Sequence, residues 1–292
     1  MKLSFDCMQC LLGQAFKLAG KHIDNDNERF LFIKKVLHEM SGIDQDTIAP
    51  QVAGNMHRIF RELSGSSDPY REEKDLYNKK MLSLEKNFDN FVVSAEDRLA
   101  AAVKLAAAGN VIDFGAVPDL DSSEVFRVIQ ETVEKDFCAA LFDRMTGDLA
   151  KGKTLLYLGD NAGEIVLDKF LIREIKRRYP RLKIYFATRG NPVINDVTVR
   201  DAKNIGVDKY AVVIDNGADF PGTILSECTE DFRDIFNSAD VIISKGQGNF
   251  ESLVDNPRKI YFIFLCKCAY FEKKLGIRKH EIVFYCNRYH DH

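Results

Sequence analysis

The feature that most constrains the fold is a change in the spacing of apolar residues near Lys151. Before it, apolar side chains recur every three or four positions, which is typical of helices that each bury one face. After it, short apolar runs alternate with segments of helical spacing, as in strands joined by crossover helices. We therefore predict an α/β fold with a doubly wound, largely parallel sheet. An all-helical domain at residues 1–150 precedes this α/β domain at residues 151–292.

The second half contains six apolar runs with the length of buried strands. Helical spacing between the runs indicates the crossover connections that a parallel sheet needs. The expected strands are 154–158, 183–188, 211–215, 240–244, 260–265 and 282–285. The expected helices among them are 164–179, 197–205, 231–237 and 268–275.

Composition excludes several classes of protein. With 46% apolar residues, 29% charged residues and seven prolines among 292 residues, the chain is neither disordered nor collagen-like. Its 41 basic and 44 acidic residues give a net charge of -3, which does not indicate a nucleic-acid partner. No apolar run approaches the ~20 residues that cross a bilayer, and the first residues lack the unbroken apolar centre of a secretory signal. We expect a cytoplasmic protein without a nucleic-acid or membrane partner, and the oligomeric state stays open.

Polar residues gather where successive predicted strands end. The relevant segments are 159–164, 189–196, 215–217 and 244–251. Because the carboxyl ends of parallel strands face one crevice, which is the general ligand site of this architecture, we expect these segments to converge. Asp160, Asn161 and Asp196 supply only oxygen ligands if the asparagine binds through its carbonyl group. Such a set suits Mg²⁺ or Mn²⁺.

Lys245 lies beside Gly246 and Gly248 in the last of these segments. A lysine charge next to flexible backbone N–H groups is suited to holding phosphate oxygens. The helix expected to begin near Gly163 adds the partial positive charge of its N-terminus. Singly, each motif is typical of an ordinary turn or helix cap. Their coincidence at four strand ends favours a metal and phosphate site.

Several sequence phrases, taken in order, resemble the damage-control phosphatase family, long catalogued as domain of unknown function 89. The segments CMQC, 68–70 and 108–115 resemble its prokaryotic branch, so the resemblance covers nearly the whole chain. It implies a helical N-terminal region, an α/β metal-binding domain and metal-dependent hydrolysis of a small phosphorylated metabolite, such as a sugar phosphate or a damaged metabolite. The phrases are LGDNAGE, RGNPVINDVT, DNG, PGT and ISKGQGNFE.

The resemblance implies roles for particular residues. It assigns metal binding to Asp160, Asn161 and Asp196, and phosphate contact to Lys245. The flanking Gly246 and Gly248 are predicted to bind substrate with it.

Another matching segment, AGNVID, places Asn110 and Asp113 near the substrate from the helical half. An ordinary turn followed by a helix cap is the alternative interpretation of these two residues.

The predicted mechanism is phosphomonoester hydrolysis with Asp160 and Lys245 as catalytic residues. A divalent Mg, Mn, Co or Ni ion activates water, while Lys245 offsets negative charge. Direct attack by Asp160 is the alternative. The haloacid dehalogenase type of covalent phosphatase has Asp-x-Asp after its first strand, and here Ala162 replaces the second aspartate. We therefore favour water as the nucleophile.

Two other classes of protein stay open. A nucleotide-cofactor enzyme, such as an S-adenosylmethionine-dependent carboxyl methyltransferase or a dehydrogenase, also has a glycine-rich turn after its first strand. Dinucleotide sites favour G-x-G-x-x-G there, whereas only Gly159 and Gly163 are present. Arg189 lies where an acidic residue commonly holds ribose hydroxyls. A non-catalytic metal or metabolite-binding protein is the second alternative.

The seven cysteines do not resemble a disulfide framework. Cys7 and Cys10 have the CxxC spacing of a zinc or redox pair, but no second CxxC completes a zinc quartet. Since this pair lies on an expected helix, we favour buried structural thiols.

Overall fold

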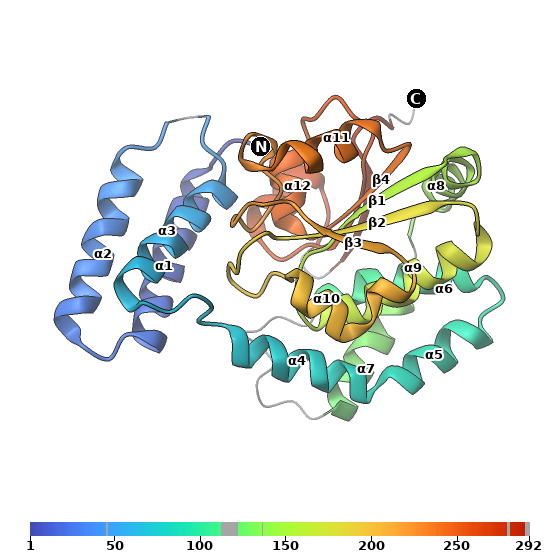
Figure 1. Cartoon of the computed structure of the whole chain (residues 1–292), viewed down its shortest axis with the longest axis horizontal. Helices are drawn as coiled ribbons and strands as arrows, with labels where there is room; N and C mark the ends of the chain where they lie inside the picture. Colours follow the sequence, from blue (N-terminus) through green and yellow to red (C-terminus); the bar gives the residue numbers. More distant parts are fainter. Residues whose placement is uncertain (45, 112–121, 136, 279–280, 290–292) are drawn as a thin grey trace.

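A computed structural model describes residues 1–44, 46–111, 122–135, 137–278 and 281–289 of the chain. Its first half is helical, as predicted (Figure 1). None of the described helices combines the length and the hydrophobicity of a membrane-spanning segment. The helices are α1 (Phe5–His22), α2 (Asp26–Ser41), α3 (Ala49–Ser64), α4 (Arg71–Ser83), α5 (Glu85–Ser94), α6 (Arg98–Ala108), α7 (Ser122–Val133) and α8 (Ala139–Lys151), with a 3-10 turn at Gly109–Val111.

The second half forms a six-stranded sheet in the order β3-β2-β1-β4-β5-β6. The first five strands are parallel, and β6 pairs antiparallel with β5. This confirms the predicted doubly wound, largely parallel sheet, and each strand begins and ends within one residue of its predicted bounds. The strand order reverses between β1 and β4, where open sheets of this kind bind ligands. The strands are β1 (Thr154–Leu158), β2 (Lys183–Thr188), β3 (Val212–Asp215), β4 (Val241–Lys245), β5 (Tyr261–Leu265) and β6 (Ile282–Cys286).

The structure contains one helix after β4 that the sequence did not predict. This helix, α12, directly follows Gly246, and the flanking glycines gave the segment the pattern of a turn. Its Phe250 and Leu253 are buried, so packing against the sheet stabilises it despite the glycines. The helices of this half are α9 (Glu164–Arg178), α10 (Val199–Ile205), α11 (Glu230–Ser238), α12 (Gln247–Leu253) and α13 (Ala269–Leu275).

Helices cover both faces of the sheet (Figure 1). Alternate strand residues point to opposite faces. Leu156 and Leu158 pack in one apolar cluster with side chains of α11, α12 and α13. Leu155 and Tyr157 pack in a second cluster with side chains of α6, α8, α9 and α10. The site at the carboxyl end of the strands is therefore supported from both sides by apolar layers.

Helices α1 to α3 have an apolar cluster of their own, whereas side chains of α4 to α8 share a cluster with the sheet. Lys151, where α8 ends, marks the change from helices to strands. A domain boundary at residues 150 and 151 stays a prediction.

The CxxC pair lies on α1 but is not buried. Ser4 caps this helix by accepting a hydrogen bond from the Cys7 backbone N–H, and Leu11 and Ala15 form part of its buried face. Cys10 is exposed and Cys7 is half-buried, so the prediction of buried thiols is wrong for this pair. Because each residue turns a helix by about 100°, Cys10 points away from the face that Leu11 buries.

Helix α3 is tied to the loops that follow β2 and β3. Arg58 Nε donates to both carboxylate oxygens of Asp219, at 2.9 and 3.0 Å. Arg61 also pairs with Asp219, and its Nη1 donates to the Pro192 carbonyl at 2.9 Å. Burial opposes ionisation of Asp219, but the hydrogen bonds and charges of the two arginines outweigh it and lower the pKa of this carboxyl. The N-terminal helices are thereby fixed against loops that lead to the site.

Helix α3 also buries a histidine. His57 is 3% exposed, and its ring centroid lies 5.7 Å from that of Tyr70. Burial, reinforced by the charge of Arg61, lowers the pKa of His57 to about 3. The folded protein therefore resists protonation of a side chain that takes up a proton near pH 6.5 when the chain is unfolded.

We predict that the free energy of unfolding falls as the pH drops from about 6.5 toward 3, because the unfolded chain gains a proton that folded His57 does not bind. His57→Phe keeps a ring at this position and removes the titrating group. It should reduce the slope of stability against pH in this range by up to about one proton. Urea denaturation of both proteins at several pH values measures the slopes, and equal slopes would contradict the prediction.

Candidate functional site

The predicted metal ligands lie together at the carboxyl end of the sheet. Asp160 and Asn161 follow β1, and Asp196 lies in the loop that follows β2. An isolated antiparallel bridge pairs Asn161 with Asp196, and the Val197 N–H donates to the Asp160 carbonyl at 2.8 Å. The loop after β2 thus turns back onto the end of β1. Residues distant in sequence converge there, as predicted.

Asp160 is surrounded by amide donors. Its Oδ2 accepts from Asn161 Nδ2 at 2.5 Å and from Asn110 Nδ2 at 3.3 Å. Asn110 comes from the 3-10 turn after α6 and also donates to Glu164 Oε2 at 2.7 Å. The structure therefore brings Asn110 from the helical half to the site, while Asp113 lies outside the described residues.

Burial and nearby negative charges raise the pKa values of Asp160 and Asp196. Burial, together with the charges of Glu164 and Asp196, raises the pKa of Asp160 well above its usual value. Burial also raises the pKa of Asp196, although the charge and hydrogen bond of Arg189 partly oppose this effect. Both carboxyl groups are therefore harder to ionise in this structure than an exposed aspartate.

Lys245, at the end of β4, is completely buried and fully hydrogen-bonded. Its Nζ donates to Ala106 O at 2.9 Å, to Glu164 Oε1 at 2.5 Å and to Asp168 Oδ1 at 2.7 Å. Burial opposes its charge, but the two carboxylates outweigh burial and raise the pKa of Lys245. Burial raises the pKa of Asp168 to about 6. All three N–H bonds of the ammonium group have acceptors, and these acceptors lie on α6 and α9.

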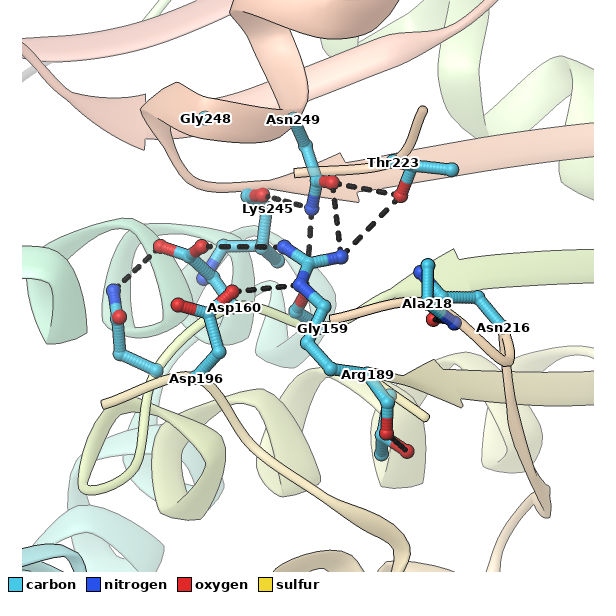
Figure 2. Close-up of polar contacts among 12 residues, drawn as sticks. Gly159, Asp160, Arg189, Asp196, Asn216, Ala218, Thr223, Lys245, Gly248 and Asn249 are labelled. Atoms are coloured by element: carbon cyan, nitrogen blue, oxygen red, sulfur yellow. Dashed lines mark hydrogen bonds and ion pairs between the residues drawn. The ribbon is translucent and has the colours of Figure 1, made fainter. Parts of the chain in front are cut away.

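Arg189 is a site residue that the sequence analysis did not assign. It follows β2 directly and is 2% exposed. Its Nε donates to Asp196 Oδ2 at 2.6 Å, and its Nη1 donates to Thr223 Oγ1 at 3.3 Å and to Asn249 Oδ1 at 3.2 Å. Figure 2 shows the guanidinium group between Asp160 and Asp196 on one side and Thr223 and Asn249 on the other. The available signal was its position at the same strand end as Asp196.

The two glycines after β4 lie in different places. Gly246 has a φ of 81°, and a Cβ atom there would lie 2.0 Å from Cγ of Asp160. A side chain at Gly246 would therefore displace Asp160. A Cβ atom at Gly248 would lie 2.0 Å from the Pro221 carbonyl oxygen, so this glycine packs against the loop after β3.

Within the part of the chain that the structure describes, no group of three or more His, Cys, Asp or Glu side chains is arranged to hold a metal ion. The predicted set of Asp160, Asn161 and Asp196 is of another kind, since it combines two carboxylates with one amide. Its role as a metal site stays a prediction at this point.

Comparison with known proteins identifies the family. Residues 4–283 match the model of the damage-control phosphatase ARMT1-like domain. The chain belongs to the damage-control phosphatase family. It is 32% identical over 298 residues to damage-control phosphatase PH1575 of Pyrococcus horikoshii, covering 99% of each chain. It is also 32% identical over 290 residues to a damage-control phosphatase of Archaeoglobus fulgidus, covering 97% of this chain and 98% of that one.

A solved structure agrees with this assignment. The crystal structure of the DUF89 family protein PH1575 of Pyrococcus horikoshii matches with a TM-score of 0.89 and 26% sequence identity, over 99% of this chain and 100% of that one. The family resemblance is therefore confirmed, and this damage-control phosphatase acts in metabolite repair on a small phosphorylated substrate. None of these findings favours a nucleotide-cofactor enzyme or a non-catalytic binding protein. The cytoplasmic location and the lack of nucleic-acid and membrane partners stay predictions.

We predict that Gly246→Ala lowers kcat/KM of the phosphatase by about 100-fold, because displacing a site residue by about 1 Å costs that much. The matched control is Gly13→Ala, since Gly13 lies inside α1 with no atom near its Cβ position. This control should keep its activity and gain about 0.5–1 kcal/mol of stability. Phosphate release and urea denaturation measure both effects, and an active Gly246→Ala enzyme would contradict the prediction.

Proposed function

We propose that this phosphatase hydrolyses small phosphate monoesters, such as sugar phosphates or damaged phosphometabolites, with a divalent cation held by Asp160, Asn161 and Asp196. The convergence of two buried carboxylates and an amide at the strand-order reversal carries this proposal. Carboxylate and amide oxygens are hard ligands that suit Mg²⁺ and Mn²⁺, and Co²⁺ and Ni²⁺ are further candidates.

The charge of the site supports a divalent cation. Within the described ranges, four buried carboxylates and two buried cationic side chains form two ion-paired sets at this edge of the sheet, and Asn110 joins the sets by hydrogen bonds to Asp160 and Glu164. The six groups leave two negative charges in excess when all are ionised. The charge of Lys267 lowers the pKa of Asp160 without reversing its upward shift. A cation of charge +2 matches this excess. The six groups are Asp160, Glu164, Asp168 and Asp196 with Arg189 and Lys245.

The residues of the chain orient the reacting groups. Glu164 accepts hydrogen bonds from Asn110 at 2.7 Å and from Asn161 at 3.2 Å, which fixes both amides beside Asp160. Lys245 holds Glu164 in place and offsets negative charge through this ion pair. A bound divalent cation polarises phosphoryl oxygens and lowers the pKa of coordinated water. We propose water as the nucleophile, because Ala162, buried in the apolar core, occupies the position where the haloacid dehalogenase type of covalent phosphatase has its second aspartate.

The substrate contacts predicted for the glycine-rich segment are part of this proposal. Gly246 adjoins Asp160, so its backbone lies at the site. Lys245 acts there through Glu164 and Asp168, with which it is hydrogen-bonded. Contacts of Gly248 with the substrate stay a prediction.

Asp160→Asn should reduce metal-stimulated phosphate release by at least about 100-fold, because it removes one charged ligand and leaves the size of the side chain unchanged. Phosphate released from a panel of sugar phosphates and other phosphate esters, with Mg²⁺, Mn²⁺, Co²⁺ or Ni²⁺, is the measurement. Asp234→Asn on the exposed side of α11 is the control and should be fully active. Full activity of wild-type enzyme in chelator, or near-normal activity of Asp160→Asn, would refute the proposal.

Lys245→Met should destabilise the protein by roughly 3–5 kcal/mol, because it leaves two buried carboxylates without their cation. The double variant Lys245→Met/Asp168→Asn should regain part of that loss, since it removes one of the uncompensated charges. Urea denaturation measures the three stabilities. A Lys245→Met protein as stable as the wild type would show that the ion pairs do not support this part of the fold.

A further inference from the structure

Two of the three guanidinium nitrogens of Arg189 donate hydrogen bonds to the protein. Nε binds Asp196, while Nη1 binds Thr223 and Asn249. Thr223 Oγ1 donates to Asn249 Oδ1 at 2.8 Å. Asn249 Nδ2 in turn donates to the carbonyl oxygens of Gly159 at 3.2 Å and Lys245 at 2.8 Å, which lie at the ends of β1 and β4. The guanidinium plane is therefore fixed by groups that belong to the sheet itself.

The remaining nitrogen has no such partner. Nη2 of Arg189 is buried, and no described residue accepts a hydrogen bond from it. Asp160 Oδ1 is 3.8 Å away, which is an ion-pair distance and too long for a hydrogen bond. A buried charged donor without an acceptor is costly, so native structures rarely leave one unless a ligand or water completes it. Nη2 therefore faces Asp160, one of the residues proposed to hold the divalent cation (Figure 2).

The two positively charged side chains of the site, Lys245 and Arg189, differ in whether they can still donate a hydrogen bond to a ligand. Lys245 uses all three of its N–H bonds within the protein. Arg189 retains donors on a guanidinium group, whose planar geometry matches phosphate oxygens. A phosphoryl group bound beside Asp160 would accept from Nη2 without breaking any hydrogen bond of the Arg189 side chain.

We propose that Arg189 is the substrate-binding residue that donates a hydrogen bond from Nη2 to a phosphoryl oxygen. This inference rests on the proposed function, because it adds an anion contact to the same site. Its Nε contact with Asp196 places that donor at a fixed position relative to the cation ligands. Lys245 donates all three of its N–H bonds to Ala106, Glu164 and Asp168, so it makes no direct contact with the phosphoryl group.

Calorimetric titration with inorganic phosphate, on protein saturated with Mn²⁺, tests the contact without turnover. Arg189→Gln should weaken phosphate binding by at least about tenfold, the loss expected for a hydrogen bond to a charged group. Its Mn²⁺ affinity should stay equal or rise, because a positive charge beside the carboxylates is removed. A role limited to positioning Asp196 predicts the opposite sign for Mn²⁺. Arg189→Lys, which keeps the charge but loses the planar fork, should bind phosphate with intermediate affinity.

Arg173→Gln is the matched control. Arg173 is a half-buried arginine of α9 that pairs with Asp89 at 2.6 Å, and its replacement should leave phosphate binding unchanged. Phosphate affinity of Arg189→Gln within about twofold of wild type would overturn the inference. So would a parallel loss of Mn²⁺ and phosphate binding, or a wild-type protein that binds no phosphate.

Failure of the proposed function gives a different result. If wild-type protein binds phosphate through Arg189 but hydrolyses no phosphate ester with any of the four metals, the anion contact stands and the hydrolytic proposal falls. If wild-type protein hydrolyses esters and Arg189→Gln binds phosphate normally, only the Arg189 contact is wrong.

Discussion

The buried ion pairs of Lys245 with Glu164 and Asp168 are the constraint on which the site depends. Carboxylates in a dry interior are stable as ions only when they are paired and hydrogen-bonded. The ammonium group, 2.5 Å from Glu164 and 2.7 Å from Asp168, meets this requirement for both. Glu164 can then accept a hydrogen bond from Asn110, and the same amide reaches Asp160. One cluster of charged and amide side chains thus joins β4, α9 and the turn after α6, and it fixes the position of Asp160 through Asn110.

The topology of the sheet places this arrangement. The strand order reverses between β1 and β4, and open sheets of this kind bind ligands at such a reversal. Gly246 has no side chain, which lets Asp160 lie directly against the backbone after β4. The loop after β2 returns to β1 through the bridge between Asn161 and Asp196. On its outer side, contacts of α3 with Pro192 hold the same loop, so the N-terminal helices support the geometry of the site.

Much of the fold follows from the sequence because buried parallel strands are continuous apolar runs whose ends are marked by polar residues. The proposed cation ligands Asp160 and Asp196 are recognisable for the same reason, since they follow such strands. Arg189 was not recognisable as a site residue, because its orientation depends on Asn249, which lies 60 positions away on α12. This helix was not predicted, because Gly246 and Gly248 gave its sequence the pattern of a turn. The partners of Lys245 were hidden likewise, since only the packing of α9 beside β4 brings them to the ammonium group.

Lys245 and Arg189 have different roles in this arrangement: Lys245 pairs with buried carboxylates, and Arg189 is proposed to bind the phosphoryl group. Lys245 is immobilised by its three acceptors and stabilises the carboxylates of Glu164 and Asp168 whether or not a ligand is present. Arg189 forms ion pairs with Asp160 and Asp196, and these three charges sum to about -1 when all are ionised. The proposed divalent cation would change the sum of these charges to about +1, which would attract a phosphate dianion instead of repelling it. On the proposed function, phosphate affinity would therefore be coupled to cation binding through charge, while the Nη2 donor of Arg189 is free of protein acceptors in either case.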